Sequence, residues 1–227
     1  MYHHVSVSES RDLTIGTSRL EEQFKWLRDN NFKSWHFSEL EELRQLPPGN
    51  NVMITFDDAY VSFRELALPL LQKYQLKATL FVPLAFLGGT DEWYSGQNPI
   101  MTSSELNTLD PSLVELGHHS FFHKKFHQMS SEEIKEDINK CREVIAKQNL
   151  NVSPALAYPY GKYPREKPAK EQFITLLKEE GFKFGLRIGN RLNAFPFKNS
   201  FEIQRLDIKG EYGLSKFKRK IKFGKVF

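Results

Sequence analysis

The chain of 227 residues has little cysteine and no long hydrophobic run. Its single cysteine, Cys141, excludes an internal disulfide framework. No apolar stretch is long enough to cross a bilayer, so we expect no transmembrane segment. The first residues, MYHHV, lack the basic and apolar regions of an export signal, which predicts a cytoplasmic location by default.

A strong excess of charge is also missing. The net charge is +4, and much of the surplus lies in residues 216–222. Because the basic residues are not interleaved with aromatics along one face, we expect no nucleic-acid partner. The basic C-terminal segment has two interpretations, a weak contact with an anionic membrane surface and a solvated helix face. Without repeats or a linker, residues 1–227 are expected to form one domain.

The chain does contain an alternation of apolar, strand-like runs and amphipathic helical segments. Strands are expected at residues 52–56, 77–82, 156–158, 184–187 and 201–206, and helices at 19–29, 62–74, 130–148 and 170–180. This alternation predicts an α/β fold with a parallel sheet covered by helices, either a closed barrel or an open doubly wound sheet. Residues 12–17 are expected to form a loop, and Ser18 is the expected N-cap of the first helix.

Two adjacent carboxylates, Asp57 and Asp58, follow the apolar strand at residues 52–56. Burying a carboxylate without a partner is costly, so a positive group should lie opposite. His119 and His123 are the best candidates, because histidines four residues apart share one face of a helical turn and can reach one ion. Asp58 would then complete a two-His, one-carboxylate metal site and leave Asp57 free as a base. Taken separately, the Asp pair is also consistent with a turn, and the histidines with a solvated loop.

Residues 55–58, TFDD, and 117–123, GHHSFFH, resemble the first two motifs of the polysaccharide deacetylase family, also called the NodB homology domain or carbohydrate esterase family 4. Those motifs read T-F-D-D and H-S/T-x-x-H. The resemblance implies a distorted (β/α) barrel that is incomplete relative to a TIM barrel. It also implies one divalent ion, zinc before cobalt, nickel or iron, with Asp58, His119 and His123 as its ligands.

The resemblance further implies a reaction, the removal of acetyl groups from an N-acetylated sugar or polysaccharide. The ion would lower the pKa of a water molecule and polarise the amide carbonyl, and Asp57 would take the proton as general base. Residues 156–161, LAYPYG, resemble the third motif, R-x-P-Y/F. In the family this segment walls the substrate groove, which assigns Pro159 and Tyr160 to substrate binding and the Tyr160 N–H to the oxyanion.

Two residues of the family pattern are missing. Ala157 stands where the third motif has the arginine that positions the catalytic Asp. Arg205 either substitutes for that arginine from a later strand or forms a solvated ion pair with Asp207. Ala59 stands where the family often has glycine, a change that matters if the position needs a positive φ.

The family's last motif, a Leu-x-His segment that carries the catalytic acid, is not visible near the C-terminus. In a closed barrel the first strand lies beside the last. We therefore expect His3, with His4 as the weaker candidate, to supply the acid or to line its pocket. The alternative is that both histidines belong to a mobile terminus.

Trp93, Tyr94, Phe121 and Tyr163 are candidates for a sugar-stacking rim, although core packing explains each ring as well. Together these features predict a metal-dependent carbohydrate N-deacetylase that acts on an N-acetylated glycan in surface or capsular polysaccharide metabolism. Two alternatives stay open: hydrolysis of an O-acetyl ester or cyclic imide, and a weakly active domain that binds glycan. Members of the family are often exported, which conflicts with a cytoplasmic location.

Overall fold

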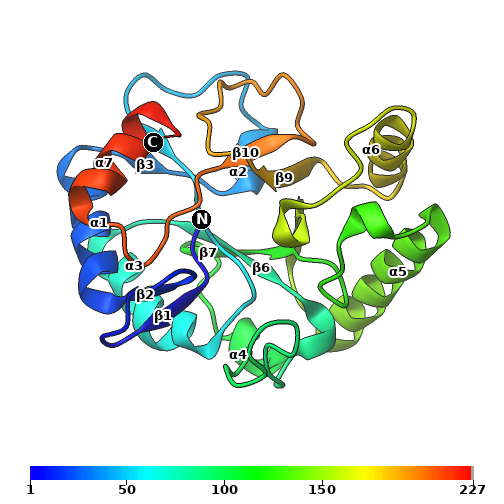
Figure 1. Ribbon diagram of the computed structural model, residues 1–227, viewed down its shortest axis with the longest axis horizontal. Coiled ribbons are helices and arrows are strands. Elements are labelled where there is room, and N and C mark those ends of the chain that lie inside the picture. The colour runs from blue at the N-terminus through cyan, green and yellow to red at the C-terminus, as the bar shows by residue number, and fades with distance from the viewer. Residues whose placement is uncertain (226–227) are drawn as a thin grey trace.

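A six-stranded parallel sheet forms the centre of the computed structural model, which describes residues 1–225 (Figure 1). The strands are β5 Ile54–Phe56, β6 Ala78–Val82, β7 Val114–His118, β8 Val152–Ala157, β9 Phe184–Ile188 and β10 Ile203–Arg205, in the spatial order β10-β9-β8-β7-β6-β5. Two short parallel pairs lie outside it, β1 His4–Ser6 with β2 Thr14–Gly16 and β3 Lys33–Ser34 with β4 Asn51–Val52. The sheet curls into a half-barrel, so the predicted incomplete (β/α) barrel is confirmed.

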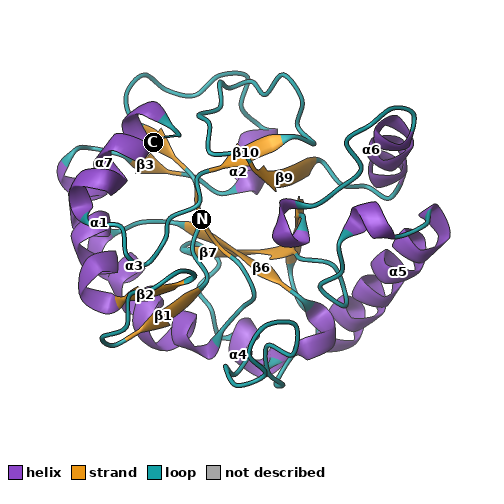
Figure 2. Ribbon diagram, viewed as in Figure 1, coloured by secondary structure: helices purple, strands orange, loops and turns teal. Residues whose placement is uncertain are grey.

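Helices surround this sheet (Figure 2). They are α1 Thr17–Asp29, α2 Phe37–Glu41, α3 Leu68–Tyr74, α4 Ser103–Asn107, α5 Ser131–Gln148, α6 Ala169–Glu179 and α7 Leu214–Phe223, with a π-helical segment Phe63–Ala67 before α3. Residues of β5 and β6 are buried throughout, as expected for a parallel sheet covered on both faces. Within residues 1–225, no helix is both long and apolar enough to span a bilayer.

The beginnings of the helices show where local sequence signals hold and where they fail. Ser130 caps α5, and Glu133 completes the capping box, as the sequence indicates. The predicted cap at Ser18 is wrong, because Gly16 is the N-cap of α1 and makes no side-chain cap. The predicted loop at residues 12–17 is also partly wrong. Thr14–Gly16 pairs with β1, and the chain passes directly from that strand into α1.

The first two residues of the chain bridge the two edges of the curled sheet. Tyr2 donates its backbone N–H to the carbonyl of Thr55 in β5 at 2.9 Å. On the other side, the Met1 nitrogen donates to the carbonyl of Leu206, just after β10, at 3.0 Å. The N-terminal segment therefore lies between the first and last strands of the sheet, as the barrel argument predicts. The alternative of a mobile terminus is wrong, and His3 follows at the carboxyl end of the barrel.

Candidate metal centre and active site

The candidate site residues gather where the parallel strands end. Asp57 and Asp58 follow β5, His119 follows β7, Pro159 and Tyr160 follow β8, and Arg205 is the last residue of β10. The carboxyl ends of parallel strands meet at one edge of a barrel, and loops there carry the functional side chains. Residues that are far apart in the sequence are thereby brought to one place.

Asp58, His119 and His123 form a buried group whose donor atoms lie within 4.8 Å of one another. The Oδ1 atom of Asp58 lies 3.4 Å from Nε2 of His119 and 3.3 Å from Nε2 of His123. Within residues 1–225 this oxygen has no hydrogen-bond partner, although buried carboxylate oxygens normally have one. Burial alone would raise the pKa of Asp58, but His119 and His123 outweigh it and lower that pKa. An ionised oxygen facing two imidazole nitrogens fits the ligand set of a divalent cation.

A backbone hydrogen bond on the side of the ring away from Asp58 fixes the orientation of His119. Its Nδ1 atom lies 2.8 Å from the backbone carbonyl of Ala157 at the end of β8, so Nδ1 carries the proton and donates it. The lone pair of Nε2 then points to Asp58, the arrangement that metal-ligating histidines adopt. Residue 157 therefore serves the site through its carbonyl, although its side chain is not the arginine of the third motif.

The two histidines reach one ion from a loop rather than from a helical turn, so that part of the prediction is wrong. Ser120 and His123 have φ values of +63° and +54°, which no helix allows. Asp137 of α5 holds the loop, because its carboxylate accepts hydrogen bonds from the Ser120 hydroxyl at 2.9 Å and the Phe121 N–H at 2.9 Å. The sequence analysis missed Asp137. Its signal was a carboxylate on the apolar face of a helix, three residues after Ile134 and four before Cys141.

Asp57 is paired with Arg205 across the gap between β5 and β10. The guanidinium donates two bonds to the carboxylate, at 2.5 and 2.8 Å, and Asp57 is 3% exposed. The interpretation of Arg205 as half of a solvated pair with Asp207 is wrong, because Asp207 pairs with Lys209 at 3.5 Å. Burial alone would raise the pKa of Asp57, but Arg205 and then His119 lower it below its usual range. Asp57 is therefore an ionised carboxylate beside the candidate metal group.

His3 lies on the other side of Asp57. Its Nε2 atom is 3.8 Å from Oδ2 of Asp57, and its side chain is 13% exposed. Burial lowers the pKa of His3, and Asp57 opposes that effect. His4 is differently placed, with Nδ1 3.4 Å from the Thr14 hydroxyl and its ring edge-on to Tyr60. Of the two predicted histidines, the fold brings only His3 to Asp57.

Two aromatic rings flank His123. Trp93 stacks on the imidazole with ring centres 4.3 Å apart, and Tyr160 meets it edge-on at 4.8 Å. Tyr160 is 43% exposed and has a φ of +57°. Tyr160 is the second residue of the short 3-10 turn Pro159–Gly161. At the start of such a turn the backbone N–H of this residue has no partner within the turn. Trp93 and Tyr160 therefore border the approach to the candidate metal group.

The loop that carries Trp93 is organised by Asp91, a second residue that the sequence analysis missed. The fully buried carboxylate accepts bonds from the N–H groups of Gln97 and Asn98, both at 3.0 Å, and from the Ser95 hydroxyl at 2.9 Å. In the sequence, an Asp followed closely by Ser, Gly, Gln and Asn is only a weak signal for such a turn.

The other predicted rim aromatics are not all at the rim. Tyr163 is 3% exposed, stacks on Tyr158 and donates to Glu202 at 2.6 Å, so it belongs to the core. Phe121 is partly buried against the core, whereas Tyr94 is exposed. Ala59 has a φ of +53° and is fully buried, so the position next to the Asp pair does adopt the left-handed conformation.

Comparisons with known proteins agree with this geometry. The profile of the family described as polysaccharide deacetylase matches residues 44–184. Poly-beta-1,6-N-acetyl-D-glucosamine N-deacetylase of Staphylococcus aureus is 25% identical over 216 residues, which cover 91% of this chain and 71% of that protein.

Two solved structures have the same fold. The Streptococcus pyogenes deacetylase PplD in complex with acetate has a TM-score of 0.78 and 21% identity, covering 97% of this chain and 96% of that one. IcaB from Ammonifex degensii has a TM-score of 0.75 and 19% identity, covering 97% and 94%. Since the family profile spans more than half of the sequence, the chain belongs to the polysaccharide deacetylase family of hydrolases.

Proposed function

We propose that this chain is a metal-dependent N-deacetylase of a polysaccharide built from N-acetylglucosamine and acts in surface polysaccharide metabolism. The observation that carries the proposal is the buried group of Asp58, His119 and His123 directly beside Asp57. The substrate class follows from the Staphylococcus aureus relative, whose name specifies a poly-beta-1,6-N-acetyl-D-glucosamine.

Asp58, His119 and His123 would hold one divalent cation, most simply zinc, which accepts two imidazoles and one carboxylate and leaves positions open. The unpartnered Oδ1 of Asp58 and the fixed tautomer of His119 support this assignment. When bound, the cation supplies acidity to a water molecule and polarises the carbonyl of the acetamido group. Cobalt, nickel and iron also suit this donor set.

Asp57 is the general base in this proposal. It takes a proton from the attacking water, for which it must be ionised and correctly oriented. Arg205 meets both needs, because its two parallel hydrogen bonds fix the plane of the carboxylate and its charge keeps the carboxylate ionised. Arg205 thus takes the positioning role that the family pattern assigns to an arginine at residue 157.

Tyr160 and Trp93 are the proposed substrate contacts. The N–H of Tyr160 would donate to the oxyanion that develops when water adds to the acetamido carbonyl. Trp93 and the exposed ring of Tyr160 offer flat apolar faces beside His123, suited to a pyranose ring. Pro159 is assigned to the same groove by its place in the third motif.

His3 is the proposed general acid, which protonates the departing glucosamine nitrogen. Its Nε2 atom lies 3.8 Å from Oδ2 of Asp57, and this carboxylate favours the protonated form of His3 that an acid needs, which supports the assignment. The amine would otherwise leave as a high-energy anion, so an acid at this position supplies a large share of the rate.

The proposal is tested by measuring acetate released from β-1,6-linked N-acetylglucosamine oligomers by the purified chain. We expect release that a chelator abolishes and that added zinc or cobalt restores. An O-acetylated sugar and a cyclic imide serve as competing substrates in the same assay. Faster turnover of either competitor would replace the N-deacetylase by another hydrolase, and no turnover of any substrate by the metal-loaded chain would favour a glycan-binding domain.

A further inference from the structure

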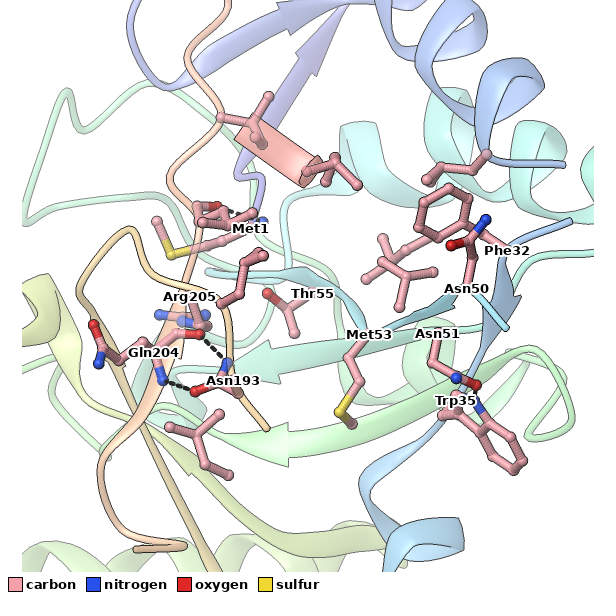
Figure 3. Close-up of a pocket in the computed structure, with 18 of the residues that line it drawn as sticks. Met1, Phe32, Trp35, Asn50, Asn51, Met53, Thr55, Asn193, Gln204 and Arg205 are labelled. Carbon is pink, nitrogen blue, oxygen red and sulfur yellow. Dashed lines mark hydrogen bonds between the residues drawn. The ribbon is translucent and has the colours of Figure 1, made fainter. Parts of the chain in front are cut away.

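The molecule contains a recess that the candidate metal ligands do not line. It is a cavity of about 850 Å³ between β5 and β10, bounded outside by the ends of α1 and α7. Asp57, Asp58, His119 and His123 do not line it, whereas Arg205 does. Figure 3 shows Arg205 and Gln204 on one side of this cavity, Phe32, Asn51 and Trp35 on the other, and Thr55 and Met53 between them. Its volume falls within the range of small-molecule sites.

Two residues that line the cavity each carry a buried polar atom that has no hydrogen-bond partner within residues 1–225. These are the hydroxyl of Thr55 and the Nε–H of Arg205, on side chains that are 3% and 6% exposed. Both groups can donate a hydrogen bond, and buried donors are normally satisfied. Since the other nitrogens of Arg205 bind Asp57, its Nε–H remains without an acceptor, and a ligand oxygen reaches this enclosed donor once the neighbouring side chains of the wall shift.

The asparagine side chains that line the cavity are, in contrast, already used by the fold. Asn193 exchanges two hydrogen bonds with the backbone of Gln204, at 2.7 and 3.0 Å. Asn51 accepts from the indole of Trp35 at 2.9 Å. The remaining wall is mostly aromatic and aliphatic. These amides stabilise the wall, so the cavity favours an apolar body over a sugar.

The mouth of the cavity carries charge of one sign. Arg191, Lys218 and Lys222 are exposed lining residues, and in the described part of the chain no Asp or Glu lines the cavity. Among residues 1–225, none of these three cations forms an ion pair with a carboxylate. An anionic group at the mouth would therefore meet several unpaired positive charges.

We propose that this cavity binds an elongated amphiphile with three parts. An acceptor oxygen at its buried end binds Thr55 and Arg205, an apolar body lies along the aromatic wall, and an anionic group meets Arg191, Lys218 and Lys222 at the mouth. The buried end is uncharged, because a second carboxylate there would lie next to the ion pair of Asp57 and Arg205 in a low dielectric.

The probe for this proposal is 12-hydroxydodecanoate, titrated calorimetrically into the full chain below the micellar concentration. Dodecanoate lacks the buried oxygen, and 1,12-dodecanediol lacks the anion. We expect saturable binding at one site, tightest for 12-hydroxydodecanoate. Trp26 and Trp35 line the cavity, so tryptophan fluorescence gives an independent signal of occupancy.

Two sets of variants locate the binding. The double variant Lys218→Ala/Lys222→Ala should weaken binding of 12-hydroxydodecanoate about tenfold at low salt, because two ion pairs are lost. The control Lys216→Ala/Arg219→Ala removes two cations of the same helix that do not line the cavity, and should change affinity by less than about twofold. Thr55→Val should abolish the preference for 12-hydroxydodecanoate over dodecanoate.

The proposal is overturned if no probe binds saturably, or if the cavity variants and the control pair weaken binding equally. The latter result would mean adsorption to the basic surface of α7. Because the readout is binding and not turnover, either failure leaves the proposed deacetylase activity untouched.

Discussion

The two adjacent carboxylates of the site, Asp57 and Asp58, lie in surroundings that are built in different ways. Asp58 faces His119 and His123, and all three lie in the region that matches the family profile. Asp57 is held by Arg205 and approached by His3, both of which lie outside that region. The proposed metal-binding half, Asp58 with its two histidines, therefore follows from local motifs. The proposed proton-transfer half, Asp57 with Arg205 and His3, depends on contacts of β5 with β10 and with the N-terminal segment.

The largest effect should come from the metal-binding half. His119→Ala removes one of three ligands and should reduce both metal content and deacetylation, the latter by at least about a thousandfold, since a catalytic metal supplies several kcal/mol. Metal analysis and acetate release on the same sample measure both effects. His127→Ala is the matched control, because this nearby histidine is exposed and should leave both values unchanged. A His119→Ala variant that still binds one metal ion would exclude His119 as a ligand.

The second prediction tests the other half, the ion pair of Asp57 and Arg205. Arg205→Met leaves the Asp57 carboxylate buried and unpaired, and should lower the free energy of unfolding by about 3–5 kcal/mol. Adding Asp57→Asn removes that charge, so the double variant should recover part of the loss in urea unfolding. Arg187→Met, on the neighbouring strand β9, serves as the control. If the double variant were no more stable than Arg205→Met, the pair would not be the source of the loss.

The third prediction concerns His3, the proposed acid beside Asp57, and its expected effect is smaller. His3→Ala should lower kcat about a hundredfold or more with metal content unchanged, in the range of general acid catalysis. His4→Ala tests the neighbouring ring, which contacts Thr14 and Tyr60 instead of Asp57, and should keep most of the activity. Equal kcat values for the two variants would remove His3 from the mechanism.

The smallest effect concerns the backbone next to the Asp pair. Ala59→Gly relieves a left-handed conformation that costs about 1–2 kcal/mol, while losing a buried methyl group of about 0.8 kcal/mol. We expect the free energy of unfolding, measured by thermal denaturation, to rise by about 0.5 kcal/mol, because these contributions partly cancel. Ala59→Val should destabilise instead, since a β-branched residue tolerates a positive φ poorly. A stable Val variant would contradict the assignment of strain to this residue.

The sequence predicts the metal-binding half because its information is local. The strand before Asp57 and Asp58, the four-residue spacing of His119 and His123, and the capped helix after Ser130 each depend on neighbouring residues. Even there, the sequence predicted a helical turn for the histidines. The buried carboxylate of Asp137 overrides that preference by accepting hydrogen bonds from the N–H groups of Phe121 and Phe122 in the loop.

The contacts of Asp57 with Arg205 and His3 could be suggested from the sequence but not established. Whether Arg205 meets Asp57 depends on which strands form the edges of the sheet, and whether His3 is near depends on the backbone bonds of Met1 and Tyr2 to both edges. These contacts are long-range, and no short pattern encodes them. The burial of Tyr163 likewise depends on its packing against Tyr158 and Phe173, which the sequence does not reveal.

The measurement that tests this division most directly compares Asp57→Asn with Asp58→Asn. Metal stoichiometry and the rate of acetate release are determined on the same preparations, with zinc added back. We predict that Asp57→Asn keeps one metal ion per chain and loses activity by about a hundredfold to ten thousandfold, as for loss of a general base. Asp58→Asn should lose the metal and the activity together. Loss of metal in both variants, or retention of it in both, would contradict the separate roles of the two carboxylates.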